Sequence, residues 1–345
     1  MSLNTKPVTS SPHKAIRIFL KIVEIALLVA IIIIASSVLL FIFVLVVPAL
    51  LKNRKDRSQV YNNQGLDYEQ NQEYSEAIEA YEQAITTYSN SAEAYYNKAN
   101  THYTLREYTQ AIENYTQAIE INRKYAEAYN NRGNTYYILE EYEKAVEDYT
   151  QALTLKPQFY RAYYNRGTAY HRLGGYENAI ADYSQALEFN TNYAEAYNNR
   201  GAASYALQKN RDVLDDYNLA IEISPDYAEA YNNRGTVYYD LKDYVKAIED
   251  YDQAIKIHPN YAEAYNNRGN VYYERKEYDQ AIEDYNKAIL SEPGYAEAFY
   301  NRGLVYQQLR ENSKAIPDFK QALQLCEQKE NPMLYKKLQA VLGKG

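Results

Sequence analysis

Asparagine recurs at one position of this sequence every 34 residues, although Asn is only a moderate helix former. Its side chain carries an acceptor oxygen and two N–H donors, which suit the C=O and N–H groups of an extended backbone. We therefore take this set of residues, the Asn ladder, as a candidate peptide-binding site. The alternative is that the copies share Asn because they descend from one duplicated unit. The ladder comprises Asn63, Asn97, Asn131, Asn165, Asn199, Asn233, Asn267 and Asn301.

Two further positions carry opposite charges in six copies of the repeat. Each Arg precedes an Asp by 16 residues, and the two would be close in an antiparallel helix pair whose Tyr and Ala positions face one another. A guanidinium can hold a carboxylate through two hydrogen bonds while its stem packs along tyrosines. We expect six structural ion pairs, with contact to a ligand as the alternative. The pairs are Arg132 with Asp148, Arg166 with Asp182, Arg200 with Asp216, Arg234 with Asp250, Arg268 with Asp284, and Arg302 with Asp318.

The other reactive side chains form no catalytic or metal-binding pattern. His13, His102, His171 and His258 are scattered, and no Cys/His group has the spacing of a zinc site. A single cysteine, Cys326, rules out an internal disulfide framework. No Gly-rich phosphate-binding loop is present, because the repeated Gly falls inside a predicted helix. The sequence therefore predicts neither an enzyme nor a bound metal or cofactor.

The charge of the chain is unevenly distributed. Residues 1–57 hold eight Lys/Arg and two acids, a net charge of +6. Because the 345-residue chain carries −8, the remaining 288 residues carry −14. Contacts with phosphates depend on a basic face, so the acidic part of the chain argues against nucleic acid as a partner.

Eight copies of a 34-residue repeat carry these side chains, in residues 58–329, without insertion or deletion. Each copy predicts two helices, for example Ala126 to about Leu139 and Tyr142 to about Leu155. Pro or Asn segments such as "LKPQF" then break the chain before the next copy. A helix pair of this length has little interior of its own, so neighbouring copies must stack to bury one. The copies begin at Ser58, Ala92, Ala126, Tyr160, Ala194, Ala228, Ala262 and Ala296.

Seven copies place Gly in the middle of the first helix, where it costs about 0.8–1 kcal/mol relative to Ala. We therefore expect another backbone to lie against this position. The chain also has 42 Tyr and only 7 Phe, which predicts buried rings whose hydroxyls reach a polar partner. The glycines are Gly65, Gly133, Gly167, Gly201, Gly235, Gly269 and Gly303.

The last segment, residues 330–345, predicts a capping helix. An open end of the stack would expose its core, so a terminal cap is expected. Four apolar residues here fall at helical spacing: Leu334, Leu338, Val341 and Leu342.

The N-terminal segment contains a 23-residue apolar run within residues 25–47, long enough to span a bilayer as a helix. We expect a basic tail (1–24), a transmembrane helix (25–47) and a basic juxtamembrane linker (48–57). A cleaved signal is the alternative, although the run is long for one and no clear cleavage site follows. The positive-inside rule favours, by a single charge, repeats on the cytoplasmic side.

The repeat resembles the tetratricopeptide repeat (TPR) family over residues 58–329. In one copy, Tyr265, Gly269, Tyr272, Ala281 and Tyr285 match the family pattern, as do Ala288 and Pro293. Tyr stands where the family usually has Trp or Phe, and Arg where it has Leu. The resemblance implies an all-α fold, a right-handed solenoid of about eight helix-turn-helix repeats. It also implies that the first helices line a concave face, with the Asn ladder turned toward a bound peptide.

Acidic and aromatic residues flank the ladder in most copies, with Glu before it and Tyr after it. If both face inward, the groove favours a protein or peptide partner with basic residues or an extended segment. The alternative is that the Glu are solvated acids favoured by the helix dipole. We expect a membrane-anchored scaffold that binds protein segments, with a structural assembly element as the alternative. The Glu residues are Glu93, Glu127, Glu195, Glu229, Glu263 and Glu297.

Overall fold

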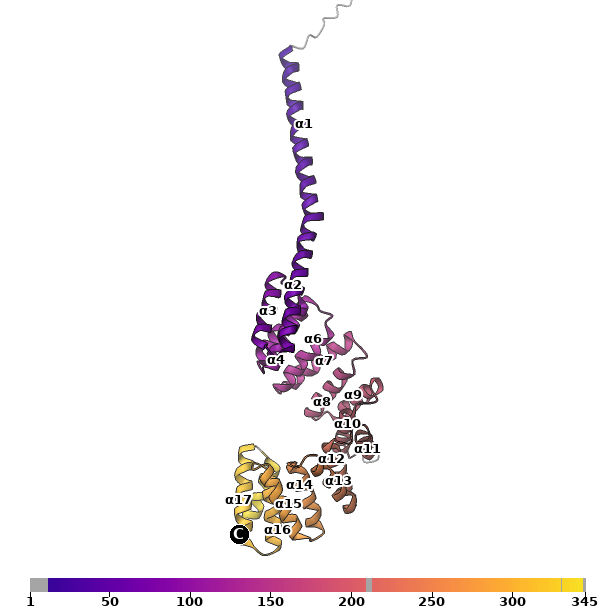
Figure 1. Ribbon diagram of the computed structural model, residues 1–345, viewed down its shortest axis with the longest axis vertical. Coiled ribbons are helices and arrows are strands. Elements are labelled where there is room, and N and C mark those ends of the chain that lie inside the picture. The colour runs from indigo at the N-terminus through magenta and orange to yellow at the C-terminus, as the bar shows by residue number, and fades with distance from the viewer. Residues whose placement is uncertain (1–11, 209–212, 330, 344–345) are drawn as a thin grey trace, which may run out of the picture. The chain divides into compact units, whose positions relative to one another are not determined.

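The computed structural model describes residues 12–208, 213–329 and 331–343, and these residues form helices joined by short turns (Figure 1). The helices cluster into two compact units, one ending at Lys124 and the other beginning at Tyr125. Each unit is an array of helical hairpins, as the 34-residue repeat predicts.

The first unit begins with a long helical segment and continues with the first two copies of the repeat. The second half of α2 serves as the first helix of copy one, and it buries Ser58, Asn62 and Gly65. Its helices are α1 (Pro12–Phe41), a π-helical segment (Ile42–Val46), α2 (Val47–Gln70), α3 (Tyr74–Thr87), α4 (Ala92–Thr104) and α5 (Tyr108–Ile121).

The apolar part of this segment is fully exposed. The helix from Phe19 to Gln70 is long and apolar enough to cross a membrane, with a mean hydropathy of 3.2 in its most apolar stretch, none of which is buried. By length and composition alone, it could be a membrane anchor or a signal sequence.

The expected basic tail and linker are helical where the structure describes them. Residues 12–24 belong to α1 and residues 48–57 to α2, while residues 1–11 lie outside the described part of the chain. Neither stretch contains Gly, and Pro48 sits in the first turn of α2, where its missing N–H is tolerated. Pro48 cannot donate to the preceding turn, which accounts for the π-helical segment just before it.

The second unit holds copies three to eight and a terminal helix. The described helix bounds in copy three match the predicted ones within one residue. The helices are α6 (Ala126–Ile138), α7 (Tyr142–Leu155), α8 (Tyr160–Arg172), α9 (Tyr176–Phe189), α10 (Ala194–Ala206), α11 (Val213–Ile223), α12 (Ala228–Asp240), α13 (Tyr244–Ile257), α14 (Ala262–Glu274), α15 (Tyr278–Ser291), α16 (Ala296–Gln308), α17 (Asn312–Lys329) and α18 (Pro332–Leu342).

The repeated Gly lies against an aromatic ring of its own copy. A Cβ added at Gly269 would lie 2.8 Å from Cε1 of Tyr285, and one at Gly303 would lie 2.7 Å from Cε1 of Phe319. At Gly167 a backbone oxygen of the second helix, Ala179 O, also lies 3.2 Å from this point, as expected, but in every one of these copies the nearest atoms belong to the ring. A ring packed against the Gly needs the same clearance as a backbone, so a recurring Gly in the sequence is compatible with either neighbour.

These tyrosines are buried, and several hydroxyls find the polar partner that the sequence predicts. Tyr149 and Tyr285 each donate at 2.8 Å to an Asn on the facing first helix, Asn134 and Asn270. Burying the ring removes a large apolar surface from water, while the hydrogen bond removes the cost of burying the hydroxyl.

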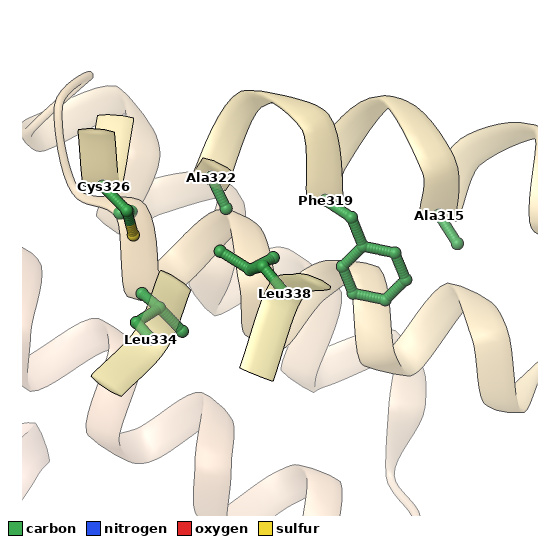
Figure 2. Close-up of a cluster of buried hydrophobic side chains, with 7 residues drawn as sticks. Ala315, Phe319, Ala322, Cys326, Leu334 and Leu338 are labelled. Carbon is green, nitrogen blue, oxygen red and sulfur yellow. The ribbon is translucent and has the colours of Figure 1, made fainter. Parts of the chain in front are cut away.

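The C-terminal helix covers the end of the last copy. Leu334 and Leu338 of α18 are buried against Phe319, Ala322 and Cys326 of α17 (Figure 2). Asn331 caps α18 by accepting from the backbone N–H of Leu334 at 3.1 Å. The helix is therefore amphipathic in the register expected of a cap.

The buried tyrosines predict alkaline unfolding. Burial raises the pKa of Tyr164 and Tyr205 to about 12, and it also raises the pKa of Tyr183, Tyr251 and Tyr285. Above about pH 10, these groups ionise in the unfolded chain but not in the folded one, so stability falls as pH rises. Helicity and phenolate absorbance should change together, in one cooperative step. Gradual ionisation with helicity unchanged would contradict this prediction.

Candidate peptide-binding face

The first helices of successive copies form one continuous face within the second unit. Helix α6 contacts α8, and the same holds for each next pair of first helices up to α14 with α16. The Asn ladder lies on this series of helices. Among copies three to eight, each ladder side chain is partly exposed. In the first unit, Asn97 is buried and Asn63 is exposed.

Each of six ladder amides donates to the preceding copy. Its acceptor is the residue just before the ladder position in that copy, as when Asn233 Nδ2 donates to Asn198 Oδ1 at 3.0 Å. In copy five the acceptor is the hydroxyl of Tyr164, which Asn199 reaches at 3.0 Å. The other donors are Asn97, Asn165, Asn267 and Asn301, at distances between 2.9 and 3.2 Å. The ladder amides are thus fixed in orientation by contacts between copies.

The residue that accepts this bond also links to the Glu of the next copy. Asn198 and Asn232 are fully buried, and their Nδ2 groups donate to Glu229 and Glu263 at 3.3 and 3.2 Å. These two Glu therefore lie on the same face as the ladder. The Glu263 residue as a whole is exposed to solvent. The side chains around its carboxylate nevertheless displace water from it, and this raises the pKa of Glu263.

Three ladder residues keep hydrogen-bonding capacity after these contacts. An Asn amide has two N–H donors and two acceptor lone pairs. Asn199, Asn233 and Asn267 use one N–H toward the preceding copy, and Asn199 and Asn267 each accept one bond from the adjacent Asn. Asn199 also interacts with the Tyr183 hydroxyl and Asn267 with the Glu263 carboxylate. Asn233 therefore keeps both a donor and an acceptor, which is what pairing with a peptide unit needs, whereas the other two keep acceptor capacity.

The structure brings each repeated Arg together with its Asp. In all six copies, Nε and Nη2 of the Arg donate to the two carboxylate oxygens at distances between 2.6 and 2.9 Å. The Asp side chains are buried, and the guanidinium lies 5.4 to 5.8 Å from the centre of the aromatic ring three residues earlier. This is the bidentate geometry that a buried carboxylate requires.

The same guanidiniums also reach the preceding copy. Nη1 of Arg166 donates to Thr150 Oγ1 at 3.0 Å, and Nη1 of Arg234 donates to Asn218 Oδ1 at 2.7 Å. The equivalent acceptors elsewhere are Ser184, Asp252 and Asn286. The Arg therefore joins its own helix pair to the preceding one. Hydrogen bonds to Asp raise the pKa of Arg166 and Arg234, so both stay charged.

Two groups of residues that make contacts between copies were not predicted from the sequence. One is the buried Asn before the ladder, which the doubled "NN" of five copies could have indicated. The other is the acceptor of the third Arg contact, a position that carries an oxygen-bearing side chain in each of copies three to seven. No group of His, Cys, Asp and Glu suited to a metal ion occurs among the described residues.

Family models match most of the repeat region. A TPR repeat model matches residues 65–105, 133–174, 169–208, 235–275 and 269–309, which together exceed half of the chain. The chain belongs to the tetratricopeptide repeat family. Two further tetratricopeptide repeat models match residues 92–125 and 296–329, and residues 114–147 and 217–249.

Solved structures share the fold of this TPR protein. A TPR protein from Parabacteroides merdae is 21% identical, with a TM-score of 0.57 over 72% of this chain and 98% of its own. A chain of the APC/C hetero-tetramer Cut9–Hcn1 is 17% identical, with a TM-score of 0.60 over 77% of this chain and 52% of its own. YrrB, described as a TPR protein with an unusual peptide-binding site, is 26% identical. Its TM-score is 0.45, over 55% of this chain and 97% of its own. A comparison with curated proteins found no match.

The Arg–Asp geometry predicts a large cost for removing one partner. Asp250→Ala leaves the Arg234 guanidinium without its carboxylate and should lower the free energy of unfolding by about 3 kcal/mol. The measurement is urea unfolding followed by helicity. Combining Asp250→Ala with Arg234→Met should cost less than Asp250→Ala alone, because the unpaired charge is removed.

An exposed pair provides the control. Lys287 contacts Glu283 at 2.7 Å on the surface of α15, so Lys287→Ala should cost less than about 1 kcal/mol. Equal losses for Asp250→Ala and Lys287→Ala would show that the buried pair contributes no more than the surface one.

Proposed function

We propose that this TPR protein is a membrane-anchored scaffold that binds protein or peptide segments on the concave face formed by its first helices. The observation that carries the proposal is the Asn ladder, whose amides are aligned on one face and held in place by the preceding copy. Amides fixed in this way can pair with a peptide backbone without first losing rotational freedom, which lowers the cost of binding.

The charge of this face supports a basic or extended partner. Glu229 and Glu263 lie beside the ladder and accept only neutral amide hydrogen bonds, so their charge is not neutralised by a cation among the described residues. Such a face raises the local concentration of Lys-rich and Arg-rich segments.

An exposed apolar stripe on the second helices would favour the alternative, a structural assembly element. Among the described residues, α9, α11, α13, α15 and α17 each carry one exposed large apolar residue, and it falls at a different position of the repeat each time, as with Val245 and Leu290. Single exposed apolar residues are normal on soluble surfaces. The scaffold proposal therefore remains the better supported.

The ladder proposal predicts loss of captured proteins when three partly exposed ladder amides are removed. A variant carrying Asn199→Ala, Asn233→Ala and Asn267→Ala should lose specific partners from a membrane-and-cytosol extract, as measured by mass spectrometry of the bound fraction. The bait is the full chain in lipid nanodiscs, checked for helicity before use.

The matched control removes the buried acceptors instead. Asn198→Ala, Asn232→Ala and Asn266→Ala break two of the same three contacts between copies, and the Asn301–Asn266 contact in place of the third. These side chains are at most 4% exposed and cannot touch a partner. The ladder variant should lose more binding than the control at equal thermal stability. If both variants capture the same proteins as the wild type, the shared Asn reflects common ancestry only.

The anchor predicts an integral membrane protein that keeps its N-terminal segment. The chain should resist extraction by alkaline carbonate, and its intact mass should include residues 1–57. Ile33→Arg with Leu39→Arg should release it, since each Arg near a helix centre costs about 2.5–3.5 kcal/mol. A membrane-free protein that starts after residue 47 would instead identify a cleaved signal.

A further inference from the structure

A pocket of about 230 Å³ opens on the first-helix face between copies six, seven and eight. Tyr239 of α12, Tyr273 and Glu274 of α14, and Asn301 of α16 contribute to its lining. Asn270 and Tyr285 also line the pocket. Asn301 belongs to the ladder, so the pocket adjoins the surface proposed to hold a peptide backbone.

The amides in the pocket are already satisfied by one another. Asn270 Oδ1 accepts from the Tyr285 hydroxyl at 2.8 Å and from Asn301 Nδ2 at 3.1 Å. Asn301 Nδ2 also donates to Asn266 Oδ1 at 2.9 Å. Both N–H groups of Asn301 are thus used, and this part of the pocket has a fixed shape.

The remaining polar groups have no such partners. Within the part of the chain that the structure describes, the Glu274 carboxylate and the hydroxyls of Tyr239 and Tyr273 make no hydrogen bond or ion pair. Burial, and then the charge of Glu274, raise the pKa of Tyr239 to about 12, so this ring stays neutral beside a carboxylate. The pocket thus combines one negative charge with the side chains of two tyrosines.

Equivalent positions in other copies are occupied by the chain itself. One copy earlier, Asp240 stands in place of Glu274 and accepts from the Tyr205 hydroxyl at 2.5 Å. In copy four, Arg172 stands there, and its Nε donates to the Tyr137 hydroxyl at 3.1 Å. This location in the repeat therefore accommodates a guanidinium against a tyrosine. In the pocket of copies six to eight, the described part of the chain supplies neither a guanidinium for the Tyr239 hydroxyl nor a hydroxyl donor for the Glu274 carboxylate.

We propose that this pocket binds one cationic side chain, lysine or arginine, of the segment held on the first-helix face. The inference rests on the proposed function and assigns the specificity of one subsite within it. The Glu274 carboxylate accepts a charge-assisted hydrogen bond, and the two tyrosine rings attract the same cation. An acidic side chain would be repelled by Glu274, and an apolar one would leave the polar groups unpaired.

The test selects random ten-residue peptides on the full chain in nanodiscs of neutral phosphatidylcholine. Wild type should enrich Lys or Arg at one peptide position. Glu274→Gln should keep selecting peptides but lose that enrichment, whereas Asp240→Asn should keep it, because Asp240 is already bound by Tyr205. For the best peptide, Glu274→Gln should weaken binding about tenfold, and it should leave binding of the peptide with Gln at that position unchanged.

The outcomes separate this inference from the proposed function. If wild type selects no peptides, the groove function fails, and the pocket assignment fails with it. Selected peptides without a basic position overturn the pocket assignment and leave the groove function standing. Equal losses in Glu274→Gln and Asp240→Asn also overturn it, because they would show that the overall negative potential of the face attracts the peptide.

Discussion

The contact between neighbouring helix pairs is the constraint on which the rest of this structure depends. A 34-residue hairpin can bury little by itself, so its stability must come from the surfaces it shares with the copies on either side. Polar side chains carry much of this connection. In copies four to eight, the third hydrogen bond of the Arg and the donated bond of the ladder Asn both run to the preceding copy. Both bonds also require a register without insertions, which the sequence keeps over eight copies.

Much of the fold could be predicted from the sequence because it repeats. The period, the helix bounds and the Arg–Asp spacing are visible as residues that recur at fixed intervals. The C-terminal cap was predicted from apolar spacing, and α18 buries Leu334 and Leu338 accordingly. The contact at the repeated Gly was not predictable in detail. A recurring Gly shows that something approaches closely, but Tyr285 lies 16 residues away on another helix, and only the structure shows that its ring fills the space.

The candidate site was likewise predictable in part from the sequence. The ladder was visible as a conserved spacing within one chain, but its hydrogen bonds to the preceding copy depend on how the copies rotate against one another. Those bonds give the Asn residues a structural role without removing their capacity to bind. Asn165 and Asn301 use both N–H groups within the protein, while Asn233 retains one, so the eight positions are chemically unequal despite their identical residue.

The unbroken helix between the apolar segment and the first repeat has a mechanical consequence. Residues 47–70 form a single helix, and its buried positions in copy one begin at Ser58. At a rise of about 1.5 Å per residue, Ser58 lies about 16 Å along the axis from Val47. A helix bends far less readily than a coil, so force on the first repeat would pass directly into the apolar segment as tilt. If the apolar segment spans a bilayer, the first repeat is held at a set height above it, and a force on that repeat acts on the segment as a lever.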